Sequence, residues 1–211
     1  AASDVYKRQY HDNMPLAAEL KADFEWAKSI AVGPGLSMNV AAAEITRCVL
    51  ERDDKVRILD ADALNIIAGE HIDYKGSREG QIIITPHIME MSRLTGKTVA
   101  DIKEHMIESA KEYAIQHSCI CILKDARTVV TDGQKVYINY TGNDGMSTGG
   151  CGDVLTGLIA GMTAMGLDAF EAACLSVYVH GKAGDYAASG KGRAGMTAAD
   201  ISEAIAYVLK R

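Results

Sequence analysis

One stretch, residues 141–161, constrains this chain more than any other, because it joins a glycine-rich loop to an apolar helical pattern. Three glycines, at positions 149, 150 and 152, surround Cys151, and glycine lets backbone N–H groups approach a ligand closely. Apolar residues then recur at helical spacing, at Val154, Leu155, Leu158, Ile159 and Met162. The pattern predicts a helix that begins at or near Gly152, with the glycine loop as its N-terminus.

The N-terminus of this predicted helix would offer free N–H donors and the positive end of the helix dipole to phosphate oxygens. Asp153 falls in its first turn and has two interpretations. Its side chain either caps the helix, as aspartate commonly does, or acts as a base that takes a proton from a hydroxyl attacking phosphorus. The spacing alone leaves both interpretations open.

Short apolar runs alternate with helical patterns along most of the chain. Strands are expected near 29–32, 56–59, 81–84 and 119–123, a hairpin over 129–138, and helices over 14–27, 39–52, 98–117, 170–188 and 197–209. This alternation favours an α/β fold with a mostly parallel central sheet covered by helices on both faces. A chain of 211 residues is long enough for one such domain.

Polar residues come directly after several of these strands. Asp62 and Asn65 follow the second strand, His87 the third and Lys124 the fourth. Ligands of open α/β sheets bind outside the carboxyl ends of the strands, so these residues are candidates for one site. Asp62 and Asn65 could support a substrate or a hydrated Mg²⁺, whereas the alternative is that Asp60 or Asp62 caps a helix.

Five motifs carry a resemblance to a known family. They are SIAVGPGLS at 29–37, DADALN at 60–65, ITPHIMEMSRLTG at 84–96, KDART at 124–128 and GMSTGGCGDVLTG at 145–157. In this order they resemble the motifs of the ADP- or ATP-dependent NAD(P)H-hydrate dehydratases, a branch of the ribokinase-like superfamily. The sequence departs from the usual family pattern at Ser37 and Asp125 in place of glycine, at Ile88-Met89 in place of Pro-Gly, and at Cys151 in place of threonine.

The resemblance implies a role for each matching residue. The catalytic base would be Asp153, and the anion hole would be formed by Gly149, Gly150, Cys151 and Gly152. The nucleotide would contact Lys124, Asp125, Ala126, Arg127, Thr128 and Gly152. The hydrated nicotinamide substrate would contact Gly35, His87 and Asp153. Support for the substrate or for Mg²⁺ would come from Asp62, Asn65 and Glu90, and no metal ligand is identified.

The function implied by the resemblance is repair of a damaged cofactor. A carbon–oxygen lyase would use ADP, or ATP, with Mg²⁺ to convert (S)-NADHX or (S)-NADPHX, the hydrated forms, back to NADH or NADPH. The implied fold is the ribokinase-like three-layer α/β/α arrangement, and the implied assembly is a homo-oligomer. Two alternatives stay open: a ribokinase-like small-molecule kinase of the hydroxyethylthiazole or sugar kinase type, and a non-catalytic nucleotide-binding remnant.

Charge and cysteine usage limit the partners and the compartment. The net charge is −6 and basic residues are not clustered, which argues against nucleic acid as a partner. No apolar run approaches the roughly 18 residues of a membrane span, and the first ten residues do not resemble a signal peptide. The 5 cysteines are widely scattered, so a disulfide framework is not expected. We therefore expect a cytoplasmic protein that does not act at a membrane.

The resemblance covers about residues 28 to 209. The family's domain usually begins with a further strand-and-helix segment upstream of the GPGLG element, and residues 1–10 do not resemble it. We expect residues 1–211 to form a single ribokinase-like dehydratase domain that is truncated at its N-terminus, with residues 1–10 outside the family's domain.

Overall fold

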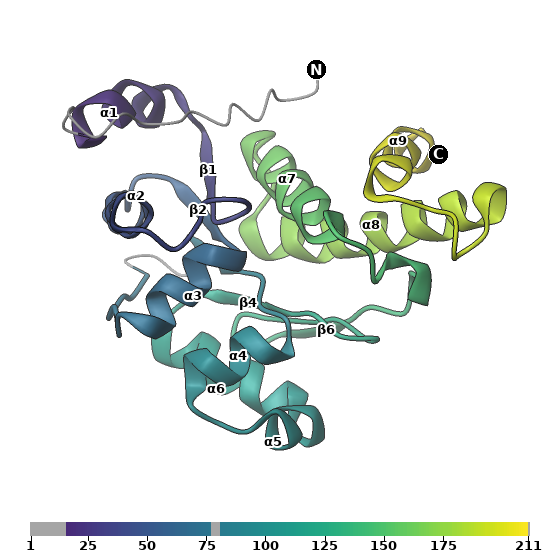
Figure 1. Cartoon of the computed structure of the whole chain (residues 1–211), viewed down its shortest axis with the longest axis horizontal. Helices are drawn as coiled ribbons and strands as arrows, with labels where there is room; N and C mark the ends of the chain where they lie inside the picture. Colours follow the sequence, from purple (N-terminus) through teal and green to yellow (C-terminus); the bar gives the residue numbers. More distant parts are fainter. Residues whose placement is uncertain (1–15, 77–80, 211) are drawn as a thin grey trace.

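The computed structural model describes residues 16–76 and 81–210, and a six-stranded sheet runs through its middle in the order β1-β2-β3-β4-β5-β6 (Figure 1). The strands β1 to β4 are parallel, and β5 and β6 continue the sheet as an antiparallel hairpin. The strands are β1 (Ser29–Val32), β2 (Val56–Leu59), β3 (Ile82–Ile84), β4 (Ile120–Leu123), β5 (Val129–Thr131) and β6 (Val136–Ile138). The prediction of a mostly parallel sheet is confirmed.

The helices lie on both faces of this sheet (Figure 1). They are α1 (Leu16–Trp26), α2 (Val40–Leu50), α3 (Ala61–Gly69), α4 (Ile88–Thr95), α5 (Val99–Glu104), α6 (Met106–His117), α7 (Cys151–Ala164), α8 (Ala169–Lys191) and α9 (Ala198–Leu209), with a short 3₁₀ turn η1 (Asp144–Met146). Residues 1–10, expected to lie outside the family's domain, and the first two residues of the expected helix 14–27 fall outside the described part of the chain.

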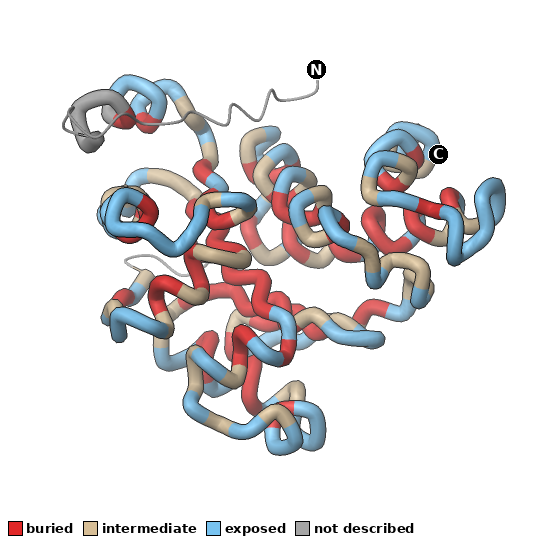
Figure 2. Tube along the Cα trace, viewed as in Figure 1, coloured by how far each residue is buried: buried red, intermediate tan, exposed pale blue. Residues whose placement is uncertain are grey.

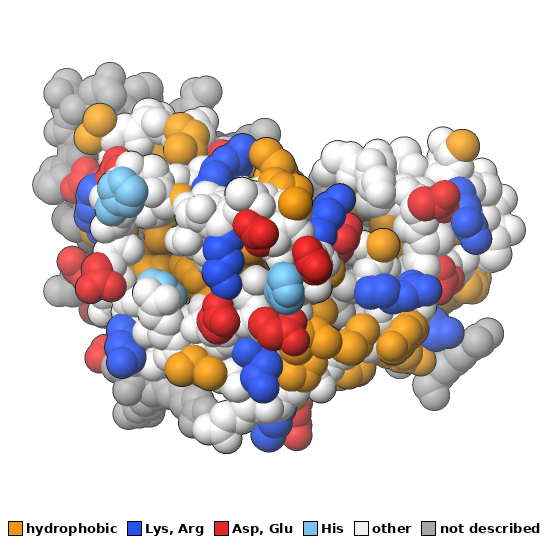
Figure 3. Space-filling model, turned by 90° about the horizontal axis from the view of Figure 1, so that it is seen from below, with side chains coloured by type: hydrophobic (Ala, Val, Ile, Leu, Met, Phe, Trp, Pro, Cys, Tyr) orange, Lys and Arg blue, Asp and Glu red, His pale blue; other side chains and the backbone are white. Residues whose placement is uncertain are grey.

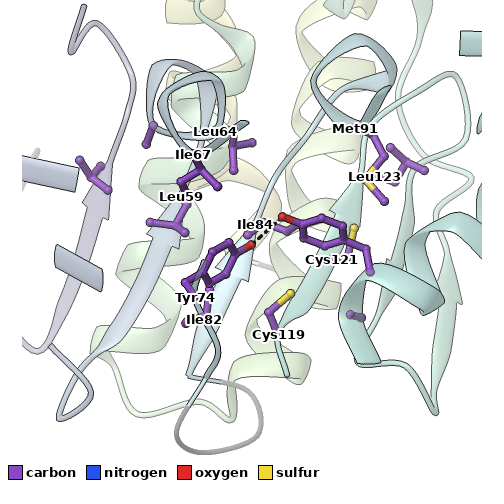
Figure 4. Packing of buried hydrophobic residues seen from close by; sticks show 14 of the residues in the cluster. Leu59, Leu64, Ile67, Tyr74, Ile82, Ile84, Met91, Cys119, Cys121 and Leu123 are labelled. Atoms are coloured by element: carbon purple, nitrogen blue, oxygen red, sulfur yellow. Dashed lines mark hydrogen bonds between the residues drawn. The ribbon is translucent and has the colours of Figure 1, made fainter. Parts of the chain in front are cut away.

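Residues that alternate along the central strands pack into two separate hydrophobic cores. Leu59, Ile84 and Cys121 project to the face covered by α1 to α6, where Figure 4 shows them among helical residues such as Leu64 and Met91. Their sequence neighbours on the same strands, Ile58, Ile83, Ile120 and Ile122, project to the face covered by α7 and α8. Strands buried on both faces are typical of a parallel sheet, and Figure 2 shows a continuous buried region in the middle of the molecule, where β3, β4 and β5 are buried along their whole length. Each fully buried side chain of this size contributes about 1.5–3 kcal/mol.

The prediction of one continuous helix over residues 98–117 is wrong. The backbone leaves the helical conformation at His105, with φ −125° and ψ 49°, and divides the segment into α5 and α6. The buried side chain of α5 is Ile102, whereas α6 buries Ala110 and Tyr113. Each of the two helices packs its own buried residues into the core. Tertiary packing thus overrides the helical preference of the sequence around His105.

The face of the molecule seen in Figure 3 is mixed in charge. Acidic and basic side chains are interspersed on the face in Figure 3, where neither charge forms an extended area. Within the described residues, every helix is either too short or too polar to cross a bilayer.

Helix α8 packs closely on the loop that leads to the glycine-rich stretch. A Cβ placed on Gly181 would lie 2.1 Å from Thr141 Oγ1, and one on Gly184 would lie 2.3 Å from Met146 Sδ. His180, which precedes Gly181 on α8, is buried, and burial lowers the pKa of its imidazole to about 4. The histidine is therefore neutral near pH 7, and the two glycines serve close packing between α8 and residues 141–146.

We predict opposite effects for alanine at two glycines of α8. Gly181→Ala should destabilise the protein by about 2 kcal/mol, since its Cβ would overlap both the side chain and the backbone of Thr141. Gly190→Ala meets nothing within 4 Å and should be neutral or stabilise by up to about 1 kcal/mol, because alanine favours a helix over glycine. Urea unfolding measures both free energies, and equal effects would contradict the packing argument.

Candidate active site

A buried ion pair holds the carboxyl ends of β2 and β4 together with the first turns of α7. Lys124 Nζ donates to Asp60 Oδ1 at 2.8 Å, and Thr156 Oγ1 of α7 donates to Asp60 Oδ2 at 2.8 Å. A Cβ on Gly152 would lie 3.6 Å from Lys124 Nζ and 3.7 Å from Asp60 Oδ2. The glycine-rich loop is thereby placed beside the residues that follow β2 and β4.

Asp60 is ionised in this setting. Its side chain is almost fully buried, and burial by itself would raise the pKa. The charge of Lys124, together with hydrogen bonds from Lys124, Thr85 and Thr156, outweighs burial and lowers the pKa of Asp60 below its ordinary value. Asp60 sits at the N-cap position of α3 but makes no side-chain capping bond, so its carboxylate serves the ion pair instead.

The loop after β1 closes over the start of α3. Gly33 approaches so closely that a Cβ there would lie 1.7 Å from the carbonyl oxygen of Asp60. Gly35 adopts φ +65°, and a Cβ placed on it would meet nothing within 4 Å. Ser37 adopts φ 72°, in the left-handed region that glycine tolerates best, and its N–H donates to Asp62 Oδ2 at 2.8 Å. Asp62 therefore fixes this loop.

The glycine-rich loop ends in the N-terminus of α7, as the sequence predicts. Gly150, with φ 89°, is the N-cap residue, and the helix begins at Cys151. Within residues 16–76 and 81–210, the N–H groups of Gly149 and Gly150 meet no hydrogen-bond acceptor, and Gly152, in the first turn, is one of the residues whose N–H has no intrahelical partner. The Cys151 N–H instead donates to the Thr148 carbonyl at 3.4 Å, and the Cys151 side chain is buried.

Asp153 occupies the third position of α7 and is exposed. In the described part of the chain its carboxylate accepts no hydrogen bond and forms no ion pair, and the helix cap is provided by Gly150. The capping interpretation is therefore not supported. A free carboxylate one turn into a helix whose N–H groups are also free is compatible with the alternative interpretation as a base.

His87 is held at the start of α4. Its N–H donates to Glu90 Oε2 at 2.8 Å, and its Nδ1 accepts from the Glu90 N–H at 3.2 Å, which together make a capping box. Burial, with the charges of Lys124 and Arg93, lowers the pKa of His87, so the ring is neutral near pH 7. With Nδ1 as acceptor, the proton sits on Nε2, which lies 3.3 Å from Glu90 Oε1.

The remaining candidates lie around this edge of the sheet. Asn65 Oδ1 accepts from Arg93 at 2.7 Å, which links α3 to α4. Asp125, Ala126 and Arg127 are exposed in the loop after β4, and the Arg127 guanidinium lies over the ring of Tyr140 at 5.3 Å. Thr128 is half-buried where this loop enters β5, and its carbonyl accepts from the Asn139 N–H at 2.9 Å.

The donor set for a divalent cation is sparse. Across the residues that the structure describes, no three His, Cys, Asp or Glu side chains cluster as a metal site. The carboxylate oxygens at this edge without a partner there belong to Asp153, Asp125 and, through Oδ1, Asp62. Mg²⁺ commonly keeps several waters and takes one or two carboxylates plus substrate phosphates, and these residues fit that mode of binding.

Three polar residues of this region are not singled out by sequence reasoning. Thr156 donates to Asp60, the Thr85 hydroxyl donates to the carbonyl of Leu59, which precedes Asp60, and lowers the pKa of Asp60, and Arg93 donates to Asn65. Thr156 lies within the apolar pattern of its helix, at the turn after Asp153, and nothing in its sequence neighbourhood indicates a partner 96 residues away.

The mostly parallel sheet lies between two helical layers, as in ribokinase-like proteins. A glycine-rich helix N-terminus and a free aspartate lie at the carboxyl ends of its strands, which makes the site suited to phosphoryl groups. The model of the NAD(P)H-hydrate dehydratase family matches residues 4–207. The chain belongs to this family.

Individual relatives agree with the family model. The chain is 45% identical over 183 residues to the bifunctional NAD(P)H-hydrate repair enzyme Nnr of Moorella thermoacetica, covering 86% of this chain and 34% of that protein. It is 35% identical to the ADP-dependent (S)-NAD(P)H-hydrate dehydratase of Neisseria meningitidis, covering 85% of this chain and 62% of that protein.

A solved relative shows the same fold. The Bacillus subtilis ADP/ATP-dependent NAD(P)H-hydrate dehydratase, co-crystallized with ATP/Mg²⁺, superposes with a TM-score of 0.79 at 32% identity, covering 90% of this chain and 68% of that one. The chain thus spans about a third of the length of the bifunctional relatives and less than two thirds of the Neisseria dehydratase.

We predict that Lys124→Met destabilises the protein at neutral pH by about 3–5 kcal/mol, since it leaves a buried carboxylate without its counter-charge. Adding Asp60→Asn should recover much of this loss. Lys97→Met, which breaks an exposed pair with Glu112, should cost less than about 1 kcal/mol. Denaturant unfolding measures all three variants, and equal costs for the two lysines would contradict the argument.

The pH dependence of stability should reverse in Lys124→Met. In the native protein the pKa of Asp60 is lowered, so its contribution is present above the ordinary carboxyl pKa and is lost as pH falls through the folded value. Without Lys124, burial dominates and raises the pKa of Asp60. Stability should then fall as pH rises from the ordinary carboxyl value through this raised value. Unfolding free energies measured from acidic to neutral pH would reveal the change of sign.

Proposed function

We propose that this chain catalyses the nucleotide-dependent dehydration of (S)-NAD(P)H hydrate, with ADP as the phosphoryl donor. One observation carries the proposal: an unpartnered Asp153 stands in the first turn of a helix whose loop N–H groups at Gly149 and Gly150 have no acceptor within the described residues. Membership of the NAD(P)H-hydrate dehydratase family and the resemblance to ADP- and ATP-dependent enzymes support it.

The proposed reaction phosphorylates the hydroxyl of the substrate because hydroxide is a poor leaving group. The hydrated nicotinamide ring carries a hydroxyl at C6, and hydroxide leaves too slowly for direct elimination. Asp153 takes the hydroxyl proton, the hydroxyl oxygen attacks the terminal phosphorus of ADP, and AMP leaves. The N–H groups of Gly149, Gly150 and Gly152 stabilise the charge on the transferring phosphoryl group. Elimination of phosphate then restores the double bond, so hydrate and ADP become NAD(P)H, AMP and phosphate.

The nucleotide would lie across the loop after β4 and the N-terminus of α7. Lys124 provides a positive charge beside Gly152, and residues 125–128 provide exposed backbone next to it. Mg²⁺ arriving with the phosphates would neutralise part of their charge, held by one or two carboxylates such as Asp153 or Asp62 and by water. Asp125 is exposed, so solvent screens its charge and reduces its repulsion of phosphate.

The hydrated nicotinamide would lie between the β1 loop and the start of α4. Gly35 leaves open space on one side, and the neutral ring of His87 is fixed on the other. Glu90 orients this ring, and burial raises the pKa of Glu90. Its role is that of a positioning residue, with Asp62 and Asn65 shaping the loops nearby.

The expected domain, compartment and assembly are part of the same proposal. We infer a single ribokinase-like catalytic domain that acts in the cytoplasm as a homo-oligomer, with small molecules rather than nucleic acid or membranes as partners. Size-exclusion chromatography with light scattering would test the assembly.

The decisive assay mixes the purified chain with NADHX or NADPHX, Mg²⁺ and either ADP or ATP, and follows the absorbance of the reduced nicotinamide. We expect absorbance to return only when nucleotide is present. Asp153→Asn should lower kcat by about a hundred- to ten-thousand-fold, because it removes the base without changing the size of the side chain.

A matched control is available on the neighbouring helix. Glu171 is an exposed acid in the first turn of α8, and Glu171→Gln should leave the rate unchanged. Full activity in Asp153→Asn would refute the assignment of the base. A stable phosphorylated product without recovery of absorbance would identify a small-molecule kinase instead.

A further inference from the structure

A pocket of about 430 Å³ opens between the β1–α2 loop, α3 and α4. It is lined by Met38, Asn65, Ala68, Gly69 and Arg93. Helices α3 and α4 pack side by side (Figure 1), and both begin at the candidate active site, α3 with Asp62 in its first turn and α4 with His87 at its cap. The pocket therefore lies beside the two helices whose first residues include Asp62 and His87.

Arg93 gives this pocket a positive charge that forms no ion pair with an acid of the described residues. Its guanidinium donates to the Oδ1 of Asn65 at 2.7 Å, and no carboxylate of the described chain forms an ion pair with it. Arg47, Arg52 and Arg193 each pair with an acid, whereas Arg57 and Arg127, like Arg93, form no ion pair with the described residues. A neutral amide thus fixes the guanidinium in place while leaving its charge and its other N–H donors free, an arrangement suited to a phosphate.

The spacing along α4 relates this charge to the active site. Arg93 follows His87 by six residues, which corresponds to about 9 Å along a helix. This separation is comparable with that between the nicotinamide ring and the pyrophosphate of a dinucleotide. The charge of Arg93 also reaches the site, since it contributes, after burial and Lys124, to the lowered pKa of His87.

Apart from Asn65 and Arg93, the lining consists of the apolar residues Met38 and Ala68 and of Gly69. Met38 is 58% exposed, and the position of Gly69 has no neighbour within 4 Å of where a Cβ would stand. A planar ring system could lie against this wall while phosphates meet Arg93. A ligand with an aromatic part joined to phosphates suits both features.

We propose that Arg93, positioned by Asn65, binds the phosphates that join the two halves of the hydrated nicotinamide dinucleotide. The inference rests on the proposed function and extends it from the reacting ring to the remainder of the substrate. It predicts that the enzyme recognises a dinucleotide rather than an isolated dihydronicotinamide.

The test compares substrates with and without phosphate. Arg93→Gln should raise KM for NADHX and NADPHX by about ten- to a hundred-fold, since it removes a charged hydrogen bond, while kcat and the KM for ADP stay close to the native values. With the hydrate of dihydronicotinamide riboside, which lacks phosphate, native enzyme and variant should have the same KM. Arg47→Gln, which breaks an exposed pair with Glu70, is the matched control and should change neither.

A second variant separates charge from packing. Asn65→Asp keeps the shape of the contact but pairs Arg93 with an acid, so it should also raise KM for the dinucleotides. An unchanged KM in Arg93→Gln, or an equal rise with the riboside, would overturn the inference.

Direct binding distinguishes failure of the inference from failure of the proposed function. If the native chain converts no hydrate, calorimetry with NADPHX decides. Binding by the native chain that is weakened in Arg93→Gln supports the inference without the reaction. Absence of binding, or equal binding by both proteins, refutes it.

Discussion

The buried ion pair between Asp60 and Lys124 is the interaction on which the geometry of the site depends. It connects β2 to β4 across the end of the intervening β3, and through Thr156 it reaches α7. A rearrangement that separated these partners would leave a charge buried without compensation, which costs several kcal/mol. The pair therefore restricts the glycine-rich loop to one position relative to the loop after β4, whatever its net contribution to stability.

Local hydrogen bonds then fix the loops that the ion pair brings together. The left-handed conformation of Ser37 costs a residue with a side chain about 1–2 kcal/mol, and the bond from its N–H to Asp62 helps to offset that cost. His87 and Glu90 hold each other in a capping box. Ser37 thus holds a backbone conformation that glycine tolerates best, because a neighbouring carboxylate supports it.

Much of the fold is predictable from sequence because its signals are local. The buried strands are short apolar runs, and the cap residues Asn39 and Thr197 stand where their helices begin. The break at His105 is not predictable, since the pattern around it is helical throughout and the packing of α5 on α4, and of α6 on β4 and β5, joins elements far apart in the sequence. The candidate site divides in the same way. The sequence identifies the glycine-rich loop and Asp153, but the ion pair of Asp60 joins residues 64 positions apart, which no local pattern reveals.

The backing of the glycine-rich loop has a consequence for the order in which the protein is made. Gly145 lies against the backbone of Arg193, and a Cβ on Gly150 would lie 3.1 Å from Ala198, so the segment before α9 supports the loop from behind. Residues 193–198 are synthesised some forty residues after the glycine-rich loop. During synthesis the glycine-rich loop is therefore made before the residues that pack behind it, and these contacts form only once residues 193–198 are in place.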